Sequence, residues 1–221
     1  MGIAKGLKAL NTTMERVAST QGERQKSEWV KLAPNETQEI RFLQEVDADS
    51  KFYSEKNGLV LAASEHTKPG DYRTKAVCTL DEEGRCYGCE RHQADYKEGW
   101  KARTRLYANV LIGSGKEATV AILSQGFSGK SITPNLLQAA ESYGGITKTV
   151  FSIKRIGSGT DTSYSLFPVK QDEDFDPEQY ELFDLEQAAV RKVPYAEQQA
   201  FFNGGSSEAY NEDSEDVSDS W

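Results

Sequence analysis

The sequence predicts a mainly β protein of the α+β class, built around a small barrel. Short stretches of alternating polar and apolar residues recur through the middle of the 221-residue chain, and glycine-rich turns separate them. One stretch with a helical pattern interrupts them, so a single helix is expected among the strands. Both ends of the chain differ in composition from this middle part, so the barrel is expected to lie between residues 28 and 171.

The predicted strands are short, and turn-forming residues separate them. They are expected at residues 29–32, 39–43, 106–112, 118–123, 147–155 and 163–167. The predicted helix follows Thr133 and Pro134 and ends at Gly144, because proline is favoured at the first helical turn and glycine just after the last. Phe42, Phe151 and Phe167 are expected in the core. A closed OB-fold-like barrel of five strands is the simplest arrangement, since closure leaves no open sheet edge.

The N-terminal segment, residues 1–27, has its own pattern. Apolar residues recur at helical spacing, at Ile3, Leu7, Leu10, Met14 and Val17, and a polar linker follows them. Two interpretations stay open. This helix either packs on its own domain or forms an arm that docks on a neighbouring copy.

Charge is distributed unevenly along the chain. Residues 172–221 contain 15 acidic residues and only Arg191 and Lys192 as bases, a net charge of −13, so the total of −9 leaves +4 for residues 1–171. A basic body joined to an acidic C-terminal part indicates nucleic-acid binding. Residues 172–203 are expected to be partly helical, and residues 204–221, with six acids and no base, to be disordered.

The three cysteines predict a metal site. Cys78, Cys86 and Cys89 lie within 12 residues, and an odd, clustered set of cysteines is a poor disulfide framework. With His66 they give the spacing H-x11-C-x7-C-x2-C, and the whole loop spans about residues 64–92. Structural Zn²⁺ is bound tetrahedrally by four Cys or His side chains. With four protein ligands, the ion has no position left for a water molecule that it could activate for catalysis. His92 is the alternative fourth ligand, although three ligands within residues 86–92 would strain a tetrahedron.

Basic and aromatic side chains are interleaved around this loop. Residues 68–107 contain nine Lys or Arg residues together with the aromatic residues Tyr72, Tyr87, Tyr96, Trp100 and Tyr107. Single-strand binders pair a basic groove with aromatic rings on which bases stack. Arg103, Arg105 and Tyr107 alternate along one predicted strand and therefore share a face. The predicted DNA contacts are Trp29, Lys31, Arg41, Lys68, Tyr72, Arg73, Lys75, Tyr87, Arg91, Trp100, Lys101, Arg103, Arg105 and Tyr107. The alternative is that the charges are solvated surface and the aromatic rings are core.

The acidic tail fits the role of a competitor and of a recruiting segment. Its carboxylates are expected to fold back on the basic groove without DNA and to be released when DNA binds. Trp221 would then give a partner protein an apolar anchor. The predicted partner-binding residues are Glu212, Asp213, Glu215, Asp216, Asp219 and Trp221.

Taken together, these motifs resemble those of the single-stranded-DNA-binding proteins of tailed bacteriophages. The matching pieces are Trp29-Val-Lys-Leu and Ile40-Arg-Phe-Leu43, the metal motif from His66 to Glu90, and residues 159–168. The resemblance implies an OB-fold body with one structural Zn²⁺ held by His66 and the three cysteines. It also implies a protein that coats single strands during replication, recombination and repair in the host cytoplasm. Further implied partners are replication proteins (polymerase, helicase or loader) bound through the tail, and self-association along DNA.

Other functional classes are disfavoured by the motifs. The chain contains no P-loop, no G-x-S-x-G and no H-E-x-x-H, and both histidines are candidate ligands, so no enzyme is predicted. No apolar stretch approaches the about 18 residues of a membrane span, and a cytoplasmic location is expected. The remaining alternative is a phage protein-docking module with a zinc loop, for example one that binds host RNA polymerase with little affinity for DNA.

Overall fold

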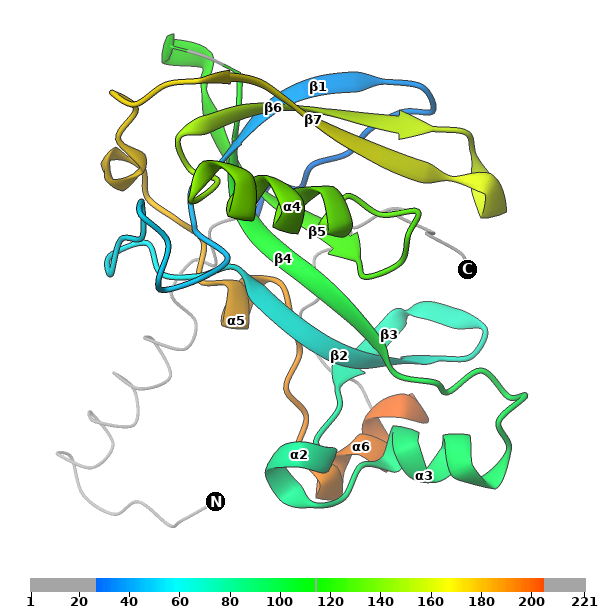
Figure 1. The fold of residues 1–221 in the computed structure, drawn as a ribbon. Helices are drawn as coiled ribbons and strands as arrows, with labels where there is room; N and C mark the ends of the chain where they lie inside the picture. The colour runs from blue at the N-terminus through cyan, green and yellow to red at the C-terminus, as the bar shows by residue number, and fades with distance from the viewer. Residues whose placement is uncertain (1–26, 114, 205–221) are drawn as a thin grey trace, which may run out of the picture.

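The computed structural model describes residues 27–113 and 115–204, and the described chain is mainly β. Figure 1 shows seven strands in one antiparallel sheet, with short helices on both sides. The strands are β1 (Thr37–Phe42), β2 (Leu61–Lys68), β3 (Asp71–Val77), β4 (Arg103–Ile112), β5 (Thr119–Gly126), β6 (Thr149–Ile156) and β7 (Ser163–Gln171). The helices are α2 (Leu80–Glu83), α3 (Tyr87–Ala94), α4 (Thr133–Tyr143), α5 (Leu185–Ala188) and α6 (Tyr195–Phe202).

Strand β4 is the centre of the sheet and divides it into two parts. The strand order is β3-β2-β4-β1-β6-β7, and β5 pairs with β4 beside this path. Residues 110–112 of β4 pair with β1, whereas residues 103–107 pair with β2. β5 pairs with residues 105–112, so it occupies the other edge of β4. The β2–β3 hairpin therefore projects from the lower half of β4, away from β1, β6 and β7 (Figure 1).

The sheet does not close into a barrel, so the predicted closed OB-type arrangement is replaced by an open sheet. The strand path ends at β3 on one side and at β7 on the other, and no pairing joins these two strands among the described residues. The long β4 pairs with both β1 and β2, so the two halves of the sheet share this strand. The mainly β class and the helix between β5 and β6 are confirmed.

The main core lies between the sheet and α4. Phe42, Phe151 and Leu136 are fully buried there, and the two phenylalanine rings meet edge to face at 5.6 Å. Each fully buried large apolar side chain contributes about 1.5–3 kcal/mol to folding. α4 begins with Pro134 in its first turn and ends at Gly144, whose left-handed φ of 73° closes the helix. The prediction of Phe167 as core is wrong, because it lies on edge strand β7 and is 59% exposed.

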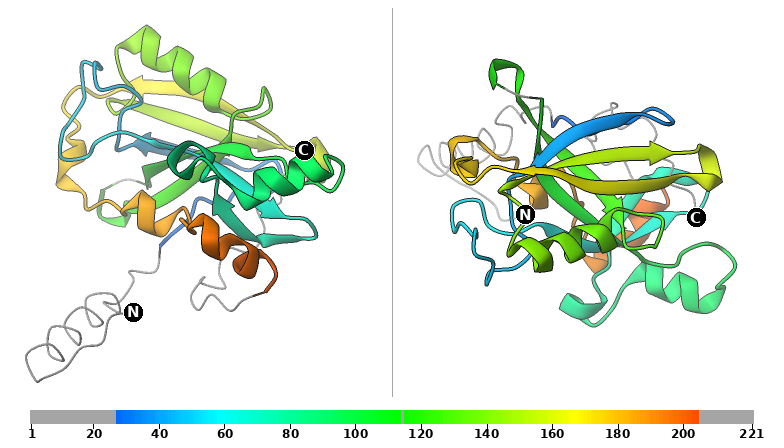
Figure 2. Two further views of the ribbon diagram at one scale, coloured as in Figure 1. Left: turned by 90° about the horizontal axis from the view of Figure 1, so that it is seen from below. Right: turned by 45° about the horizontal axis from the view of Figure 1, so that its top comes forward.

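The acidic segment after β7 packs along the body and crosses to the opposite side of the sheet from α4. Figure 2 shows α4 on one side and α5 and α6 on the other. Leu185 and Val190 pack against Tyr107 on β4, whereas α4 covers the face that carries Leu106. At its start, Asp172 accepts a hydrogen bond from Arg41 at 2.7 Å. The expectation of partial helix in residues 172–203 matches α5 and α6.

Several elements differ from their predicted form. Residues 29–32 make an isolated parallel bridge between Trp29 and Ile122 and not a strand of the sheet. The predicted metal loop contains two strands and two helices. The expected N-terminal helix and the final acidic tail lie in residues 1–26 and 205–221, outside the described residues. Within residues 27–113 and 115–204, none of the helices has the length and apolar character that a membrane crossing requires.

Candidate metal centre and nucleic-acid interface

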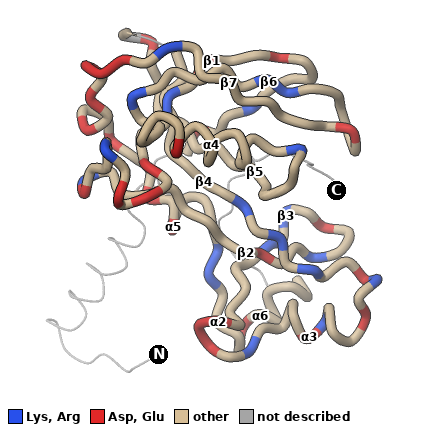
Figure 3. The backbone as a smooth tube through the Cα atoms, in the orientation of Figure 1, with Lys and Arg blue, Asp and Glu red and all other residues tan. Residues whose placement is uncertain are grey.

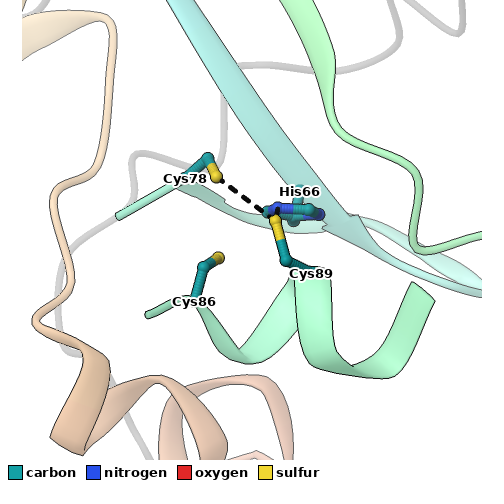
Figure 4. A group of neighbouring side chains, drawn as sticks. All are labelled: His66, Cys78, Cys86 and Cys89. Atoms are coloured by element: carbon teal, nitrogen blue, oxygen red, sulfur yellow. Dashed lines mark hydrogen bonds between the residues drawn. The ribbon is translucent and has the colours of Figure 1, made fainter. Parts of the chain in front are cut away.

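Four side chains from three separate elements converge below the β2–β3 hairpin. His66 comes from β2, Cys78 follows β3, and Cys86 and Cys89 lie at the start and in the first turn of α3. Figure 4 shows the three sulfur atoms and the imidazole turned toward one another. Their ligand atoms all lie within 4.8 Å of one another, so this group can hold one metal ion.

The spacing of these atoms fits a tetrahedral ion. Cys78 Sγ lies 3.5 Å from Cys89 Sγ, and Cys89 Sγ lies 3.3 Å from His66 Nε2. A tetrahedron with Zn–S bonds of about 2.3 Å has edges of about 3.8 Å. The observed separations, from 3.3 to 4.8 Å, bracket that value. The donor set, three thiols and one imidazole, is typical of structural zinc sites.

His66 is held in the orientation that a metal ligand needs. The side chain is buried, and its Nδ1 lies 2.6 Å from the backbone oxygen of Trp100. When Nδ1–H donates to this carbonyl, Nε2 carries the free lone pair and faces the cysteines. Such a second hydrogen bond fixes both the tautomer and the ring orientation of metal-binding histidines.

The thiols perturb one another because they share a small volume. Burial raises the pKa of Cys86, but hydrogen bonds from His66 and from the backbone of Cys89 and Thr79 outweigh it and lower this pKa to about 6. Burial and the neighbouring thiols raise the pKa of Cys89 to about 12. Three thiolates this close repel one another, and a bound dication removes that repulsion. The cluster therefore favours a divalent cation as its partner.

Gly88 has a steric role in this centre. It lies in α3 directly under the imidazole, and a Cβ at this position would lie 2.3 Å from His66 Cγ. Its backbone is helical and does not need the left-handed region that favours glycine. Glycine is required here because the helix backbone and the ligand ring approach so closely.

We expect Gly88→Ala to weaken metal binding by about 10- to 100-fold, as changes that misplace a ligand do. The added methyl must push the His66 ring away from the cysteines. Helix propensity alone predicts that this variant is more stable, because alanine stabilises a helix interior by about 1 kcal/mol over glycine. A loss of metal affinity would therefore come from the steric clash and not from the helix. Competition with a chromophoric chelator measures the affinity. Gly129→Ala, where a Cβ meets nothing within 4 Å, is the matched control; equal affinities for the two variants would refute the steric argument.

His92 is outside the ligand group. It lies in the last turn of α3, half-buried, and lines a pocket together with His66, Cys89, Tyr96 and Lys101. Of the two histidines, only His66 belongs to the four-residue group in the described part of the chain. The preference for His66 as fourth ligand therefore agrees with the geometry.

Next to the metal centre, four cations share one face of the β2–β3–β4 sheet. These residues, Arg73, Lys75, Arg103 and Arg105, are called the basic face below. The strand register aligns Glu65 with Arg103 and Ala63 with Arg105, and Lys75 lies opposite Thr67, so their side chains alternate onto the same side. Arg73 and Arg103 are exposed. Figure 3 shows Lys and Arg on β3, on the adjoining part of β4 and at the end of β2, with Asp and Glu on the loops before β2 and after β7.

A buried polar network lies under the basic face. Tyr107 donates to Glu65 at 2.5 Å, and Lys75 Nζ donates to the Tyr107 hydroxyl at 3.0 Å. Lys75 is also paired with Glu65 at 3.5 Å. Burial lowers the pKa of Lys75, and the Glu65 carboxylate offsets this only in part. The network links β2, β3 and β4 through their side chains. Glu65 could not be recognised from its sequence context, because only its partners in the fold distinguish a buried carboxylate from a solvated one.

Three predicted stacking rings are part of the core instead. Tyr107 is 0% exposed and packs against Trp29 and α5, and Trp100 is 6% exposed and packs against Phe202 of α6. Tyr87 is half-buried between Trp100 and Phe202. These corrections share one cause, since the C-terminal segment folds back over both clusters. The prediction that Arg103, Arg105 and Tyr107 share a face is confirmed, but the segment covers the tyrosine end of that face.

The remaining predicted contacts divide into two groups. Arg41 is half-buried and lies far from the hairpin. It forms an ion pair with Asp172 and stacks over the Phe175 ring at 4.4 Å, so its side chain binds the acidic segment. Arg91 binds both oxygens of Glu98 at 2.6 Å. Arg73 is an exposed member of the basic face. The other exposed or half-exposed residues near the basic face and the metal centre are Lys68, Tyr72 and Lys101. Lys31 is exposed and lies outside this group, two residues beyond the bridge of half-buried Trp29 with Ile122.

Comparison of the chain with protein-family models, with curated proteins and with solved structures gave no match. The geometry of the metal centre and of the basic face is therefore what bears on function. Gln198 of α6, which hydrogen-bonds to the backbone N–H of Tyr87 and to the hydroxyl of Thr79, each adjacent to a cysteine, was missed by sequence reasoning. Glutamine in an acidic segment gives no pattern that distinguishes a buried role from a solvated one.

Proposed function

We propose that this protein binds single-stranded DNA without sequence preference and that one structural Zn²⁺ shapes its binding surface. The observation that carries the proposal is the basic face, four cations on adjoining strands of a protein whose net charge is −9. Such a concentration of one sign in an acidic protein favours a polyanion as ligand. Neutralised phosphates release counterions, which supplies most sequence-independent affinity.

Exposed aromatic rings on the β2–β3 hairpin and beside the metal centre support a single strand over a duplex. Tyr72 is 64% exposed near the tip of the β2–β3 hairpin, on the opposite face of β3 from Arg73, and Tyr96 is 71% exposed. Tyr96 and Lys101 line one pocket, which puts a ring and a cation at the same site. Unpaired bases stack on such rings, at about 1–3 kcal/mol per base, whereas the bases of a duplex are already stacked.

The metal in this proposal is structural and does no chemistry. Four protein ligands complete a tetrahedral shell, so Zn²⁺ in this site would have no position for a water or a substrate. Its contribution is to fasten β2, the end of β3 and the start of α3 to one another. Those elements carry or flank the basic face, and Zn²⁺ would hold its cations at fixed spacing for the phosphates.

The acidic tail is proposed to compete with DNA and to recruit partners. Residues 205–221 contain six carboxylates and no base, and they follow Asn203, which lines a pocket with Lys68 and Arg91. The last described residues before the tail thus lie near Lys68, a cation that would be available to phosphate. When DNA displaces it, the tail becomes available to replication proteins. Self-association along the strand remains a proposal that rests on residues 1–27.

Deleting residues 205–221 is expected to tighten binding to oligo-dT, most strongly at low salt. The reason is electrostatic, because screening shortens the reach of the carboxylates from about 10 Å at 0.1 M salt to about 3 Å at 1 M. Fluorescence anisotropy at several salt concentrations measures the effect. A full-length variant with all six acids changed to their amides separates charge from length. Affinity that is equal or weaker in both proteins would contradict competition by the tail.

Hydrogen exchange with and without oligo-dT tests where DNA binds. We expect added oligo-dT to slow the exchange of amides in β2, β3 and residues 101–107 and to leave β7 unchanged. A matching duplex at the same concentration is the control and should give little protection. Protection confined to β6 and β7, or none among the described residues, would be evidence against the proposed surface.

A further inference from the structure

We infer that helix α6 completes the metal centre, with Gln198 as a positioning residue, and that metal binding and docking of α6 are thermodynamically coupled. The inference rests on the proposed metal site but not on DNA binding. It assigns the C-terminal segment a role beyond covering the sheet. Its basis is a set of contacts in which α6 touches a residue adjacent in the chain to each cysteine and the residue whose carbonyl is the hydrogen-bond partner of His66.

Gln198 joins the segments that carry two of the cysteines. Its side chain is 0% exposed, and its Oε1 accepts a hydrogen bond of 2.8 Å from the backbone N–H of Tyr87, the residue after Cys86. Its Nε2 donates to Thr79 Oγ1 at 3.0 Å, and Thr79 follows Cys78. A second Nε2 bond, to the Val193 carbonyl, anchors the amide within its own segment. One buried amide therefore holds Cys78 and Cys86 at a fixed separation.

The other two ligands are reached through neighbouring contacts. Tyr195 donates to Glu90, the residue after Cys89, at 3.0 Å. Phe202 packs edge to face against Trp100 at 5.1 Å, and the Trp100 carbonyl is the partner of His66 Nδ1. A displacement of α6 would therefore act on every ligand of the group.

The segment that carries the cysteines has little apolar burial of its own. α2 is four residues long and buries none of them, and in α3 the only buried residue is Gly88. Short helices without a buried apolar face are not stable alone. Their positions must be fixed by contacts from outside, and these include the ligand cluster, α6 and the packing of Tyr87 against Trp100. The ligand cluster and α6 each favour the arrangement that the other requires, and linkage makes the effect reciprocal.

Gln198→Ala is expected to weaken zinc binding of the full-length protein by about 10- to 100-fold, the range found when residues that orient ligands are removed. Gln199→Ala is the matched control, since the adjacent glutamine is exposed, and should change the affinity less than twofold. Tyr195→Phe, which removes one hydroxyl near the surface, is the milder variant and should weaken binding by a few fold. Competition with a chromophoric chelator gives all three values. The second readout is hydrogen exchange of residues 195–203, which should be slower with zinc than without it.

The outcomes separate this inference from the proposals on which it depends. Equal zinc affinity of the Gln198→Ala and Gln199→Ala proteins, or equal protection of α6 with and without zinc, would overturn the coupling while leaving the metal site intact. A native protein that binds no zinc would overturn the metal site and the coupling together. Failure to bind DNA would affect neither.

Discussion

Removal of the metal is expected to lower the Tm of this protein by about 8–16 °C. At a free zinc concentration one thousand times Kd, binding stabilises the folded state by about 4 kcal/mol. For a protein of this size, each kcal/mol shifts Tm by about 2–4 °C. The shift arises because the four ligands converge only in the folded chain, so metal binding is also folding energy.

Differential scanning calorimetry before and after chelation, with elemental analysis of the bound metal, measures this shift. Cys86→Ser is the matched control. Loss of this buried ligand should lower Tm even before chelator is added, and chelation should then change Tm little. An unchanged Tm after verified loss of the metal would show that the cluster does not stabilise the fold.

The double variant Arg103→Gln and Arg105→Gln is expected to bind oligo-dT about 60-fold more weakly at 50 mM salt. Each phosphate contact to a single strand contributes a salt slope of about −0.7, so one contact is worth about eightfold at this concentration. The two arginines lie on one face of β4. Glutamine keeps much of the apolar part of each arginine side chain. The Arg105 side chain donates a hydrogen bond to Ser124. The salt slope should also become less negative by about 1.4.

The control carries the same change of charge on the opposite part of the sheet. Lys154 and Lys170 are exposed on β6 and β7, so changing both to glutamine removes two positive charges far from the basic face. We expect only a small loss of affinity from this protein. If both double variants lose affinity equally, binding would depend on net charge and not on the basic face.

The sequence predicted the elements whose signals are local. β1, β4, β5 and the β6–β7 hairpin have alternating residues with turns between them, and α4 has Pro134 and Gly144 at its ends. β2 was missed because its buried positions include Glu65 and His66, which break the apolar pattern of a strand. The strand forms because its neighbours β3 and β4 give those two side chains partners.

The metal ligands were predictable, whereas the binding face was predictable only in part. Cysteine and histidine are rare in this chain, so their spacing stands out in the sequence. The burial of Tyr107 and Trp100 depends on Leu185 and Phe202, which follow them by more than 75 residues. No local sequence pattern predicts that an acidic segment folds back over an aromatic ring. The prediction of a closed barrel was wrong for the same reason, since strand order is set by long-range pairing.

The central claim, binding to single-stranded DNA, is tested most directly by equilibrium anisotropy titrations of labelled oligo-dT, a mixed-sequence single strand and the matching duplex. The titrations run from 50 to 200 mM salt, with the native protein and with residues 205–221 removed. We predict similar affinity for both single strands, weaker binding to the duplex, and a steep loss of affinity as salt increases. No binding to either single strand at 50 mM salt by the protein without its tail would contradict the claim.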